Sequence, residues 1–387
     1  MKNTNAEIVF TLPAALGGVA SFNFSVINNA TLKNSITTRV ILIKSKEDTR
    51  PVFTDKFDVD ECTIFEYSEK ENQYFVHKRL ETLIGKKPGA VVCDNGITIQ
   101  SCSMFNNPKT IFHLLHDYFY VKQNISFGDV VDVAVAHSSF FADCVFSSNP
   151  KDFAGRTYYI PYGVEQYQGM PVKSTNGNLK VFFLGRLDYG KGVEKLIEME
   201  NLLQQKSVNV DWTIIGKGKL EQEIKQKWNN KKNVEFKQPE TSADVYNILK
   251  EQDVFAFPTE FEGTPVSIME AFSNANAVIV SDLPGGIRDM VTEEVGFRVA
   301  LHNVADFANK IEYLAKNRNY LSKMQESAWN KAKKNYDTKE NSNKYFELFL
   351  RFDELKRKKT TNTIQLKNKL DKPFIPNSIV KLIRTIK

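Results

Sequence analysis

Short apolar segments alternate with helical patterns along the 387-residue chain, and this alternation restricts the fold more than any other feature. Strands that are buried on both faces read as continuous apolar runs, and strands that alternate with helices build a parallel sheet covered on both faces. Two series of strands are predicted: 7–12, 38–43, 90–93, 110–115, 131–136 and 157–160, then 180–184, 210–215, 233–236, 254–257, 277–280 and 296–299. This repetition predicts an α/β protein with two doubly wound, Rossmann-like parallel-sheet domains.

The boundary between the two series is predicted at 163–178, where glycine, proline and serine are typical of a loop. We therefore expect an N-terminal domain at 1–165 and a second domain at 166–335. A helix at 336–354 is expected to pack back on the N-terminal domain. Residues 355–387 are expected to form a basic amphipathic tail.

The positive charge of the chain is concentrated in this tail. The formal net charge is +6, and residues 355–387 hold ten Lys and Arg residues against one acidic residue, Asp371. The remainder of the chain therefore carries a small net negative charge. A protein whose body binds nucleic acid would be basic over that body, so we expect no nucleic-acid partner.

Cysteine usage and the first residues favour a cytoplasmic protein. The four cysteines are far apart and form no Cys-x-x-Cys motif, which argues against structural zinc and a disulfide framework: Cys62, Cys93, Cys102 and Cys144. The apolar stretch 8–20 is interrupted by Pro13 and by Gly17-Gly18, so it predicts a strand and a glycine loop rather than a signal peptide. No apolar run reaches the length that spans a bilayer.

Two carboxylates eight residues apart, Glu262 and Glu270, flank the predicted start of a helix that follows strand 254–257. Eight helical residues rise about 12 Å, roughly the span from a sugar across a diphosphate to a ribose. A helix N terminus between them favours phosphate. One carboxylate can bind sugar hydroxyls and the other ribose hydroxyls, although glutamates on an amphipathic helix are also commonly solvated.

Arg186 and Lys191 lie five residues apart around a glycine-rich turn after strand 180–184. Open α/β sheets bind ligands at the carboxyl ends of their strands. Both cations can converge there on a diphosphate and stabilise a leaving nucleotide. The alternative is a basic surface loop.

Three glycine turns follow other predicted strands: Gly17-Gly18, Gly216-Lys217-Gly218 and Gly285-Gly286. Glycine lets the backbone approach a phosphate or a sugar closely, although plain turns have the same composition. Gly17-Gly18 is not a full G-x-G-x-x-G motif, so a dinucleotide oxidoreductase is weakly supported.

His116 ends strand 110–115, which places it at the edge of the sheet where a sugar can bind, with a structural histidine as the alternative. Nearby aromatic residues are interpreted either as an acceptor-binding wall or as core: Phe112, Tyr118, Phe119 and Tyr120. Asp58-Val59-Asp60 has the D-x-D form of metal-binding motifs but lies in an acidic, irregular stretch. We expect no metal there.

In order and spacing, the motifs of residues 180–300 resemble those of family 4 of the retaining glycosyltransferases, which has the GT-B fold. The matching segments are Gly185-Arg186-Leu187 with Lys191-Gly192, Ile215-Gly216-Lys217-Gly218, Glu262 to Glu270, and Gly285-Gly286. The N-terminal half carries fewer matches: Gly17-Gly18, His116 and residues 160–164.

The resemblance implies two domains that face each other across a cleft, and a nucleotide-diphosphate sugar, UDP- or GDP-linked, as donor with no metal or cofactor. The implied catalytic residues are Glu262 and His116 at the sugar and Arg186 and Lys191 at the diphosphate. The implied donor-binding residues are Gly17, Gly18, Gly216, Gly263, Thr264, Pro265 and, at the ribose, Glu270.

Three positions depart from the family pattern. Tyr162 stands where asparagine is usual, and Asp289 stands where glutamate often follows the glycine pair. Lys237-Gln238 replaces a glycine near the expected base-binding region, so the nucleotide base stays open.

The implied reaction transfers a sugar to an acceptor hydroxyl with retention of configuration, in bacterial cell-surface polysaccharide, lipopolysaccharide or other glycolipid biosynthesis. The acceptor would be a glycan or a lipid-linked glycan. Alternatives are a nucleotide-sugar epimerase of the same architecture, a non-catalytic sugar-nucleotide binding protein and a dehydrogenase. The basic tail fits either an anionic membrane surface at the inner face of the cytoplasmic membrane or solvent.

Overall fold

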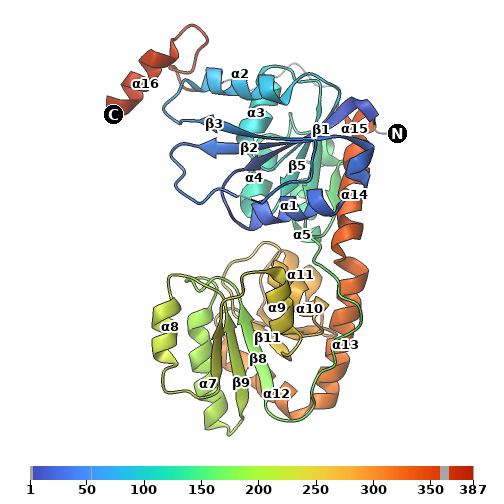
Figure 1. Ribbon diagram of the computed structural model, residues 1–387, viewed down its shortest axis with the longest axis vertical. Coiled ribbons are helices and arrows are strands. Elements are labelled where there is room, and N and C mark those ends of the chain that lie inside the picture. The colour runs from blue at the N-terminus through green and yellow to red at the C-terminus, as the bar shows by residue number, and fades with distance from the viewer. Residues whose placement is uncertain (1–2, 54, 358–365, 387) are drawn as a thin grey trace. The chain divides into compact units, whose positions relative to one another are not determined.

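The computed structural model describes residues 3–53, 55–357 and 366–386. The chain divides into two units, each with its own sheet (Figure 1). The first unit comprises Met1–Pro161 and Thr338–Lys387, and the second comprises Tyr162–Asp337. All strand pairs within the two sheets are parallel, which confirms the predicted α/β architecture with two doubly wound domains.

The sheet of the first unit has seven strands in the order β3-β2-β1-β4-β5-β6-β7. Their bounds are β1 Asn3–Pro13, β2 Ile36–Ser45, β3 Glu61–Tyr67, β4 Gly89–Cys93, β5 Thr110–Leu115, β6 Val133–Ala136 and β7 Thr157–Tyr159. The central strands are buried on both faces, as their apolar runs predict. The order of the strands along the chain reverses between β1 and β4.

The helices of the first unit cover both faces of this sheet. They are α1 Gly18–Asn29, α2 Gln73–Ile84, α3 Gly96–Met104, α4 Tyr118–Ser126, α5 Ser139–Ser148, α6 Pro150–Phe153, α14 Thr338–Leu350, α15 Phe352–Leu355 and α16 Asn377–Ile386, with a 3-10 turn η1 Leu32–Ser35. Side chains of Asn72, Asn95, Asp117 and Ser138 cap four of them by accepting backbone hydrogen bonds.

Helix α14, which follows the second unit in the chain, completes the core of the first unit. The rings of Phe346 and Phe349 lie 5.8 and 5.7 Å from the ring of Phe10 in the central strand β1. The Tyr345 hydroxyl lies 2.6 Å from His137 Nδ1 and donates to Ile160 O over the same distance. Residues of α14, which lie more than 300 positions after Phe10 in the sequence, therefore pack in the core beside the first sheet.

The sheet of the second unit has six strands in the order β10-β9-β8-β11-β12-β13. Their bounds are β8 Leu179–Leu184, β9 Val210–Ile215, β10 Val234–Lys237, β11 Val254–Phe257, β12 Ala277–Ser281 and β13 Gly296–Val299. The helices are α7 Leu196–Gln205, α8 Glu221–Lys227, α9 Ser242–Leu249, α10 Val266–Ser273, α11 Gly286–Met290, α12 Val304–Lys316 and α13 Arg318–Asn335, with a 3-10 turn η2 Val193–Lys195. The strand order reverses between β8 and β11, so ligands are expected beyond the carboxyl ends of these strands.

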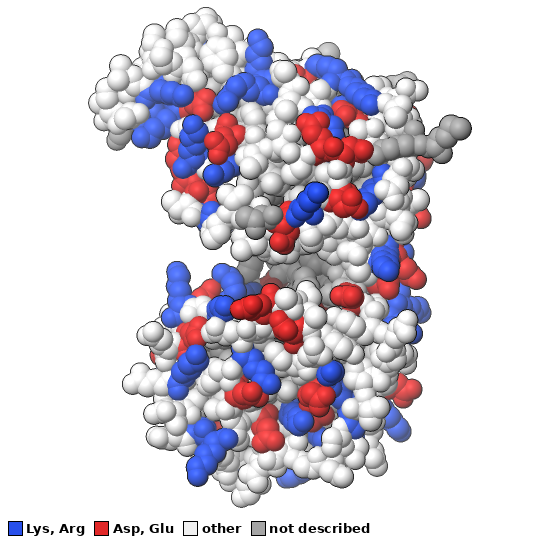
Figure 2. All heavy atoms as spheres, viewed as in Figure 1, with Lys and Arg blue, Asp and Glu red and all other residues white. Residues whose placement is uncertain are grey.

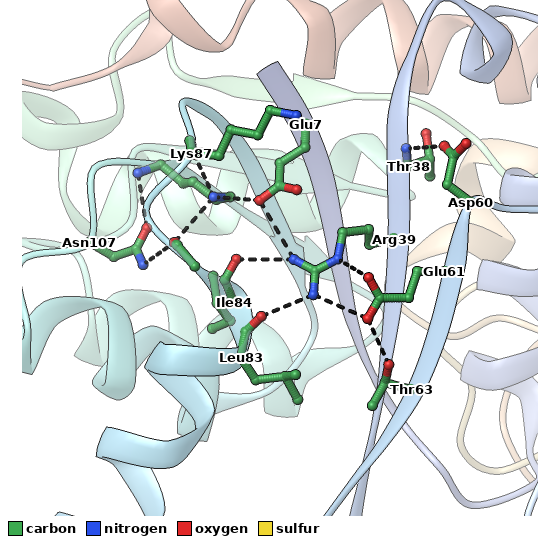
Figure 3. Close-up of polar contacts among 12 residues, drawn as sticks. Glu7, Thr38, Arg39, Asp60, Glu61, Thr63, Leu83, Ile84, Lys87 and Asn107 are labelled. Atoms are coloured by element: carbon green, nitrogen blue, oxygen red, sulfur yellow. Dashed lines mark hydrogen bonds and ion pairs between the residues drawn. The ribbon is translucent and has the colours of Figure 1, made fainter. Parts of the chain in front are cut away.

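Strand β3 was not among the predicted strands. It lies at the sheet edge, where most of its residues are exposed or half-buried, so its sequence lacks an apolar run. Arg39 on β2 holds it by an ion pair of 2.9 Å to Glu61, and Figure 3 shows the Arg39 guanidinium between Glu61 and Glu7. Asp60 accepts a hydrogen bond from the backbone N–H of Thr38, so part of the predicted D-x-D motif anchors this edge.

Among the residues that the structure describes, no helix is both long and apolar enough to cross a membrane.

Candidate functional site

Four loops of the second unit meet at the carboxyl ends of β8, β9, β11 and β12. Backbone hydrogen bonds join them: Gly185 N–H to Ile215 O (3.1 Å), Glu260 N–H to Gly190 O (2.8 Å) and Gly286 N–H to Gly263 O (2.9 Å). These loops carry the predicted diphosphate, sugar and phosphate residues of the second unit. The structure therefore brings together segments that are up to about a hundred residues apart in sequence.

Lys191 and Glu262 form an ion pair between two of these loops. Their side chains are 21% and 14% exposed, so the pair is largely withdrawn from water. Burial raises the pKa of the Glu262 carboxyl, and the positive charges of Lys191 and Arg186 oppose that rise. The loops thus present an ammonium group and a carboxylate side by side, and a sugar diphosphate can use both.

Arg186 completes the cationic part of the site. It lies two residues after the end of β8, at the start of the loop. Its side chain is 74% exposed, and its guanidinium lies 3.0 Å from the Asp188 carboxylate. An exposed, long side chain can turn toward an anionic ligand and contact it through two parallel N–H groups.

Glu270 lies on α10, one turn beyond the loop that carries Glu262. Its side chain is partly buried, and burial alone raises the pKa of its carboxyl to about 7. Among the described residues, no hydrogen-bond or ion-pair partner of this carboxylate is found. A carboxylate withdrawn from water without a protein partner is suited to accept hydrogen bonds from a bound ligand, such as ribose hydroxyls.

The N terminus of α10 lies between the two carboxylates. Pro265 is the N-cap residue and makes no side-chain hydrogen bond to the first N–H groups of the helix, and Gly263 and Thr264 come just before it. These N–H groups and the positive end of the helix dipole favour a phosphate. Glu262, the N terminus of α10 and Glu270 therefore follow one another along one segment, in the order that the sequence spacing predicts.

Packing alone explains the glycine at 216. Its φ is +141°, and a Cβ there would lie 1.9 Å from the carbonyl oxygen of Gly185. At Gly17 and Gly18, in contrast, a Cβ would meet no described atom within 4 Å, and the φ of 167° at Gly17 is ordinary extended backbone. The fold therefore requires Gly216, whereas it does not require the glycine pair before α1.

This contrast gives a prediction. Gly216→Ala should lower the free energy of unfolding by about 2–4 kcal/mol, because loop backbone must move. Gly17→Ala and Gly18→Ala should each change it by less than about 1 kcal/mol, which urea denaturation measures. If the pair approaches the donor, both substitutions should still lower activity. Full activity in both variants would contradict a donor role for Gly17 and Gly18.

His116 follows β5 in the first unit and is only 5% exposed. Its ring lies 4.8 Å from the ring of His137, 4.9 Å from that of Tyr120 and 5.3 Å from that of Phe22 on α1. Its Nε2 atom lies 3.6 Å from Asp94 Oδ2. The histidine thus sits at the carboxyl ends of β4 and β5, beside the helix that begins at the Gly17-Gly18 loop.

The aromatic residues around His116 have different environments. Phe112 is fully buried against Phe349, with ring centroids 5.2 Å apart, and Tyr118 packs on Phe141 at 5.3 Å. Phe119 is 64% exposed. The core interpretation holds for Phe112, whereas Tyr118 and Tyr120 are half-buried, and Phe119 is the most exposed aromatic residue of this group.

A tyrosine stack near Glu270 was not predicted. The rings of Tyr167 and Tyr246 lie 3.5 Å apart at 23°. Burial raises the pKa of the Tyr167 hydroxyl to about 12, and the negative charges of Glu165 and Glu270 contribute to the rise. The two tyrosines are 79 residues apart, in a loop and in α9, and no motif links them.

The sequence matches one protein family, Glycosyl transferases group 1, over residues 171–334. It is 30% identical to the capsular polysaccharide biosynthesis glycosyltransferase CapM of Staphylococcus aureus over 147 residues. These residues make up 37% of this chain and 38% of that protein. It is 33% identical over 115 residues to UDP-Gal:alpha-D-GlcNAc-diphosphoundecaprenol alpha-1,3-galactosyltransferase of Escherichia coli, 29% of each chain. The matched stretches thus span less than two-fifths of either relative.

Solved structures match over a greater length. The structure of Anabaena Alr3699/HepE in complex with UDP superimposes with a TM-score of 0.70 at 15% identity, and covers 88% of this chain and 99% of that one. At this identity the likeness shows the fold, which is GT-B.

Proposed function

We propose that this chain, which belongs to the Glycosyl transferases group 1 family, transfers a sugar from a nucleotide-diphosphate donor to an acceptor hydroxyl with retention of anomeric configuration. One observation carries the proposal. The Lys191–Glu262 pair, the N terminus of α10 and the Glu270 carboxylate, for which no partner is found among the described residues, follow one another along the carboxyl edge of the second sheet. That order matches sugar, diphosphate and ribose.

The geometry supports a division of labour. Breaking the bond between the anomeric carbon and the diphosphate leaves negative charge on the leaving group, and Arg186 and Lys191 would stabilise it. Glu262 would accept hydrogen bonds from sugar hydroxyls, and Glu270 would accept them from the ribose. His116 is the proposed contact near the reaction centre from the first unit. Following the family, the acceptor would attack on the face that the leaving group vacates.

We propose a UDP-sugar as donor. The Anabaena protein of the same fold was solved with UDP, and the name of the Escherichia coli relative includes UDP-Gal. In this chain, Lys237 ends β10 and Gln238 follows it, near the expected base position, and the Gln238 amide donates to Glu221 at 2.6 Å. These polar side chains, rather than a glycine, would contact the base.

For the acceptor we propose a lipid-linked glycan of cell-surface polysaccharide biosynthesis. The Escherichia coli relative is named for a diphosphoundecaprenol acceptor, and the Staphylococcus aureus relative is named for capsular polysaccharide. A lipid-linked acceptor would bring the enzyme to the inner face of the cytoplasmic membrane, where nucleotide sugars are available.

Thermal unfolding with nucleotides tests the donor site. A ligand at a hundred times its Kd stabilises the folded state by about 2.7 kcal/mol, so UDP and its sugars should raise the melting temperature by several degrees. GDP, ADP and dTDP should raise it less, and Mg²⁺ should not be needed. Arg186→Ala should remove most of the shift, since its exposed guanidinium is not required by the fold.

Two outcomes would contradict this assignment. An equal shift by all four nucleotides would mean that the base is not read. A UDP shift that persists in Arg186→Ala would place the diphosphate elsewhere. Donor hydrolysis without acceptor separates a transferase from a binding protein, and an epimerised donor in that assay would favour the epimerase alternative.

A further inference from the structure

The C-terminal helix α16 carries apolar side chains that the first unit leaves uncovered. Ile379, Leu382 and Ile386 are 49%, 63% and 77% exposed, and Phe374, just before the helix, is 79% exposed. The three helical residues are spaced three and four apart, so they line one face. The opposite side of the helix packs on the protein through Val380, which is fully buried.

The uncovered face belongs to the segment 366–386, here called the docking segment. Hydrogen bonds and an ion pair hold this segment against the start of α2. Arg384 forms a two-pronged ion pair with Asp371 at 3.0 and 2.9 Å. Asp371 also accepts a hydrogen bond from the backbone N–H of Gln73, the first residue of α2, at 2.7 Å. Little conformational freedom therefore remains to be lost when the exposed face binds a partner.

Further hydrogen bonds centre on Asn72, the cap of α2. Its side chain donates to the carbonyl oxygens of Lys372 and Ile375 at 2.9 and 2.8 Å, and its backbone N–H donates to Asn377 at 2.8 Å. Asn72 is fully buried beneath the segment. The segment is thus a folded part of the first unit rather than a solvated tail, although residues 358–365 of the predicted tail lie outside the described residues.

The docking segment is basic on its exposed side. Its lysines are Lys367, Lys369, Lys372 and Lys381, and no ion pair with a described residue involves any of them. Its one acidic residue, Asp371, is neutralised by Arg384. Figure 2 shows the segment as a lobe at the upper left with a broad uncharged surface and lysine and arginine side chains beside it.

We propose that the docking segment lies on an anionic lipid surface, with Phe374, Ile379, Leu382 and Ile386 in the headgroup region and the lysines against lipid phosphates. Exposed apolar area and positive charge on one short segment are what interfacial binding requires. A second copy fits less well, since standard interfaces use about 20–30 residues a side and two copies would oppose their lysines. The inference does not depend on the proposed sugar transfer.

Co-sedimentation of the full chain with vesicles tests the proposal, without donor or acceptor. Binding to phosphatidylcholine vesicles should rise when phosphatidylglycerol is added and fall with salt. Replacing the four apolar residues of the segment by serine should weaken binding about tenfold or more. Replacing its four lysines by glutamine should lower binding to the anionic vesicles by a similar factor, with little effect on neutral ones.

A matched control removes exposed apolar side chains elsewhere: Ile64→Ser, Phe146→Ser and Val172→Ser, which are 52%, 47% and 97% exposed in the native chain. This variant should bind vesicles like the native protein, and all variants should keep its melting temperature within a few degrees. Equal sedimentation of the native and serine variants would overturn the proposal. So would a dimer in sedimentation velocity that the serine substitutions abolish while vesicle binding is unchanged.

Discussion

Lys191→Ala is expected to lower kcat/KM about 10²- to 10³-fold, which corresponds to about 3–4 kcal/mol of lost transition-state stabilisation. The ammonium group would oppose the charge on the leaving diphosphate, and alanine removes it. Glu262→Ala should cost a similar factor, because the carboxylate would hold the sugar hydroxyls. Steady-state kinetics with a UDP-sugar measures both effects.

Stability separates this catalytic role from a structural one. Each single substitution leaves one partly buried charge without its partner and should lower the free energy of unfolding by about 1–2 kcal/mol. The double variant removes both charges and should regain part of that stability while it stays inactive. Recovery of activity together with stability would mean that the pair only holds the two loops together.

The chain supplies a matched control in the same loops. Lys195 and Glu260 form an ion pair of 2.7 Å, with side chains 14% and 38% exposed, and neither is assigned to the donor. Lys195→Ala should therefore lower the free energy of unfolding by an amount comparable to that of Lys191→Ala. It should lower kcat/KM by less than about tenfold. A loss as large as that of Lys191→Ala would contradict the site assignment.

Glu270→Gln is expected to stabilise the protein without ligand and to weaken donor binding. Burial raises the pKa of the Glu270 carboxyl in the folded state to about 7 from its ordinary value of 4.5, so the folded state binds more protons than the unfolded state between these pH values. Stability consequently falls as the pH rises from about 4.5 to about 7 and stays lower above it. Glutamine is neutral at every pH, so Glu270→Gln should raise the free energy of unfolding by about 1–3 kcal/mol at pH 8. This gain in stability should disappear below pH 4.5.

The same substitution, Glu270→Gln, is expected to weaken the binding of UDP although it raises the stability of the protein. A ribose hydroxyl bonded to a carboxylate contributes about 1.5–3 kcal/mol, so the affinity for UDP should fall at least tenfold in the glutamine variant. Urea denaturation at pH 8 and at pH 4.5 gives the stability, and calorimetric titration gives the affinity. Glu293→Gln, at an exposed position outside the site, is the control and should change neither. An unstabilised Glu270→Gln variant with native affinity would remove Glu270 from the site.

The parts of the fold that could be predicted are those buried on both faces. A central strand such as Val254–Phe257 must be apolar throughout, so it stands out in the sequence. The edge strand Glu61–Tyr67 is held by Arg39 and by backbone pairing to β2, and neither leaves an apolar pattern. The places of the candidate-site loops in the second unit were predictable for a related reason, since each loop follows the end of a buried strand.

Other features depend on contacts between distant segments and were beyond sequence reasoning. Lys173 is a half-buried lysine in the loop before β8, and its amine donates to the carbonyl oxygens of Leu249, Lys250 and Gln252. Nothing around it in sequence distinguishes it from a solvated lysine. The tyrosine stack beside Glu270 and the docking of α16 on α2 likewise appear only when the chain is folded.

The return of the chain to the first unit has a consequence for synthesis on the ribosome. The core around Phe10 and His137 is closed by Phe346, Phe349 and Tyr345, which are synthesised after the second unit. The second unit, Tyr162–Asp337, is contiguous and is complete before them. During translation the second unit can fold first, while the N-terminal sheet waits for its final helix with apolar surface exposed. The nascent chain is therefore expected to rely on chaperones chiefly for the part of the first unit that precedes the second unit.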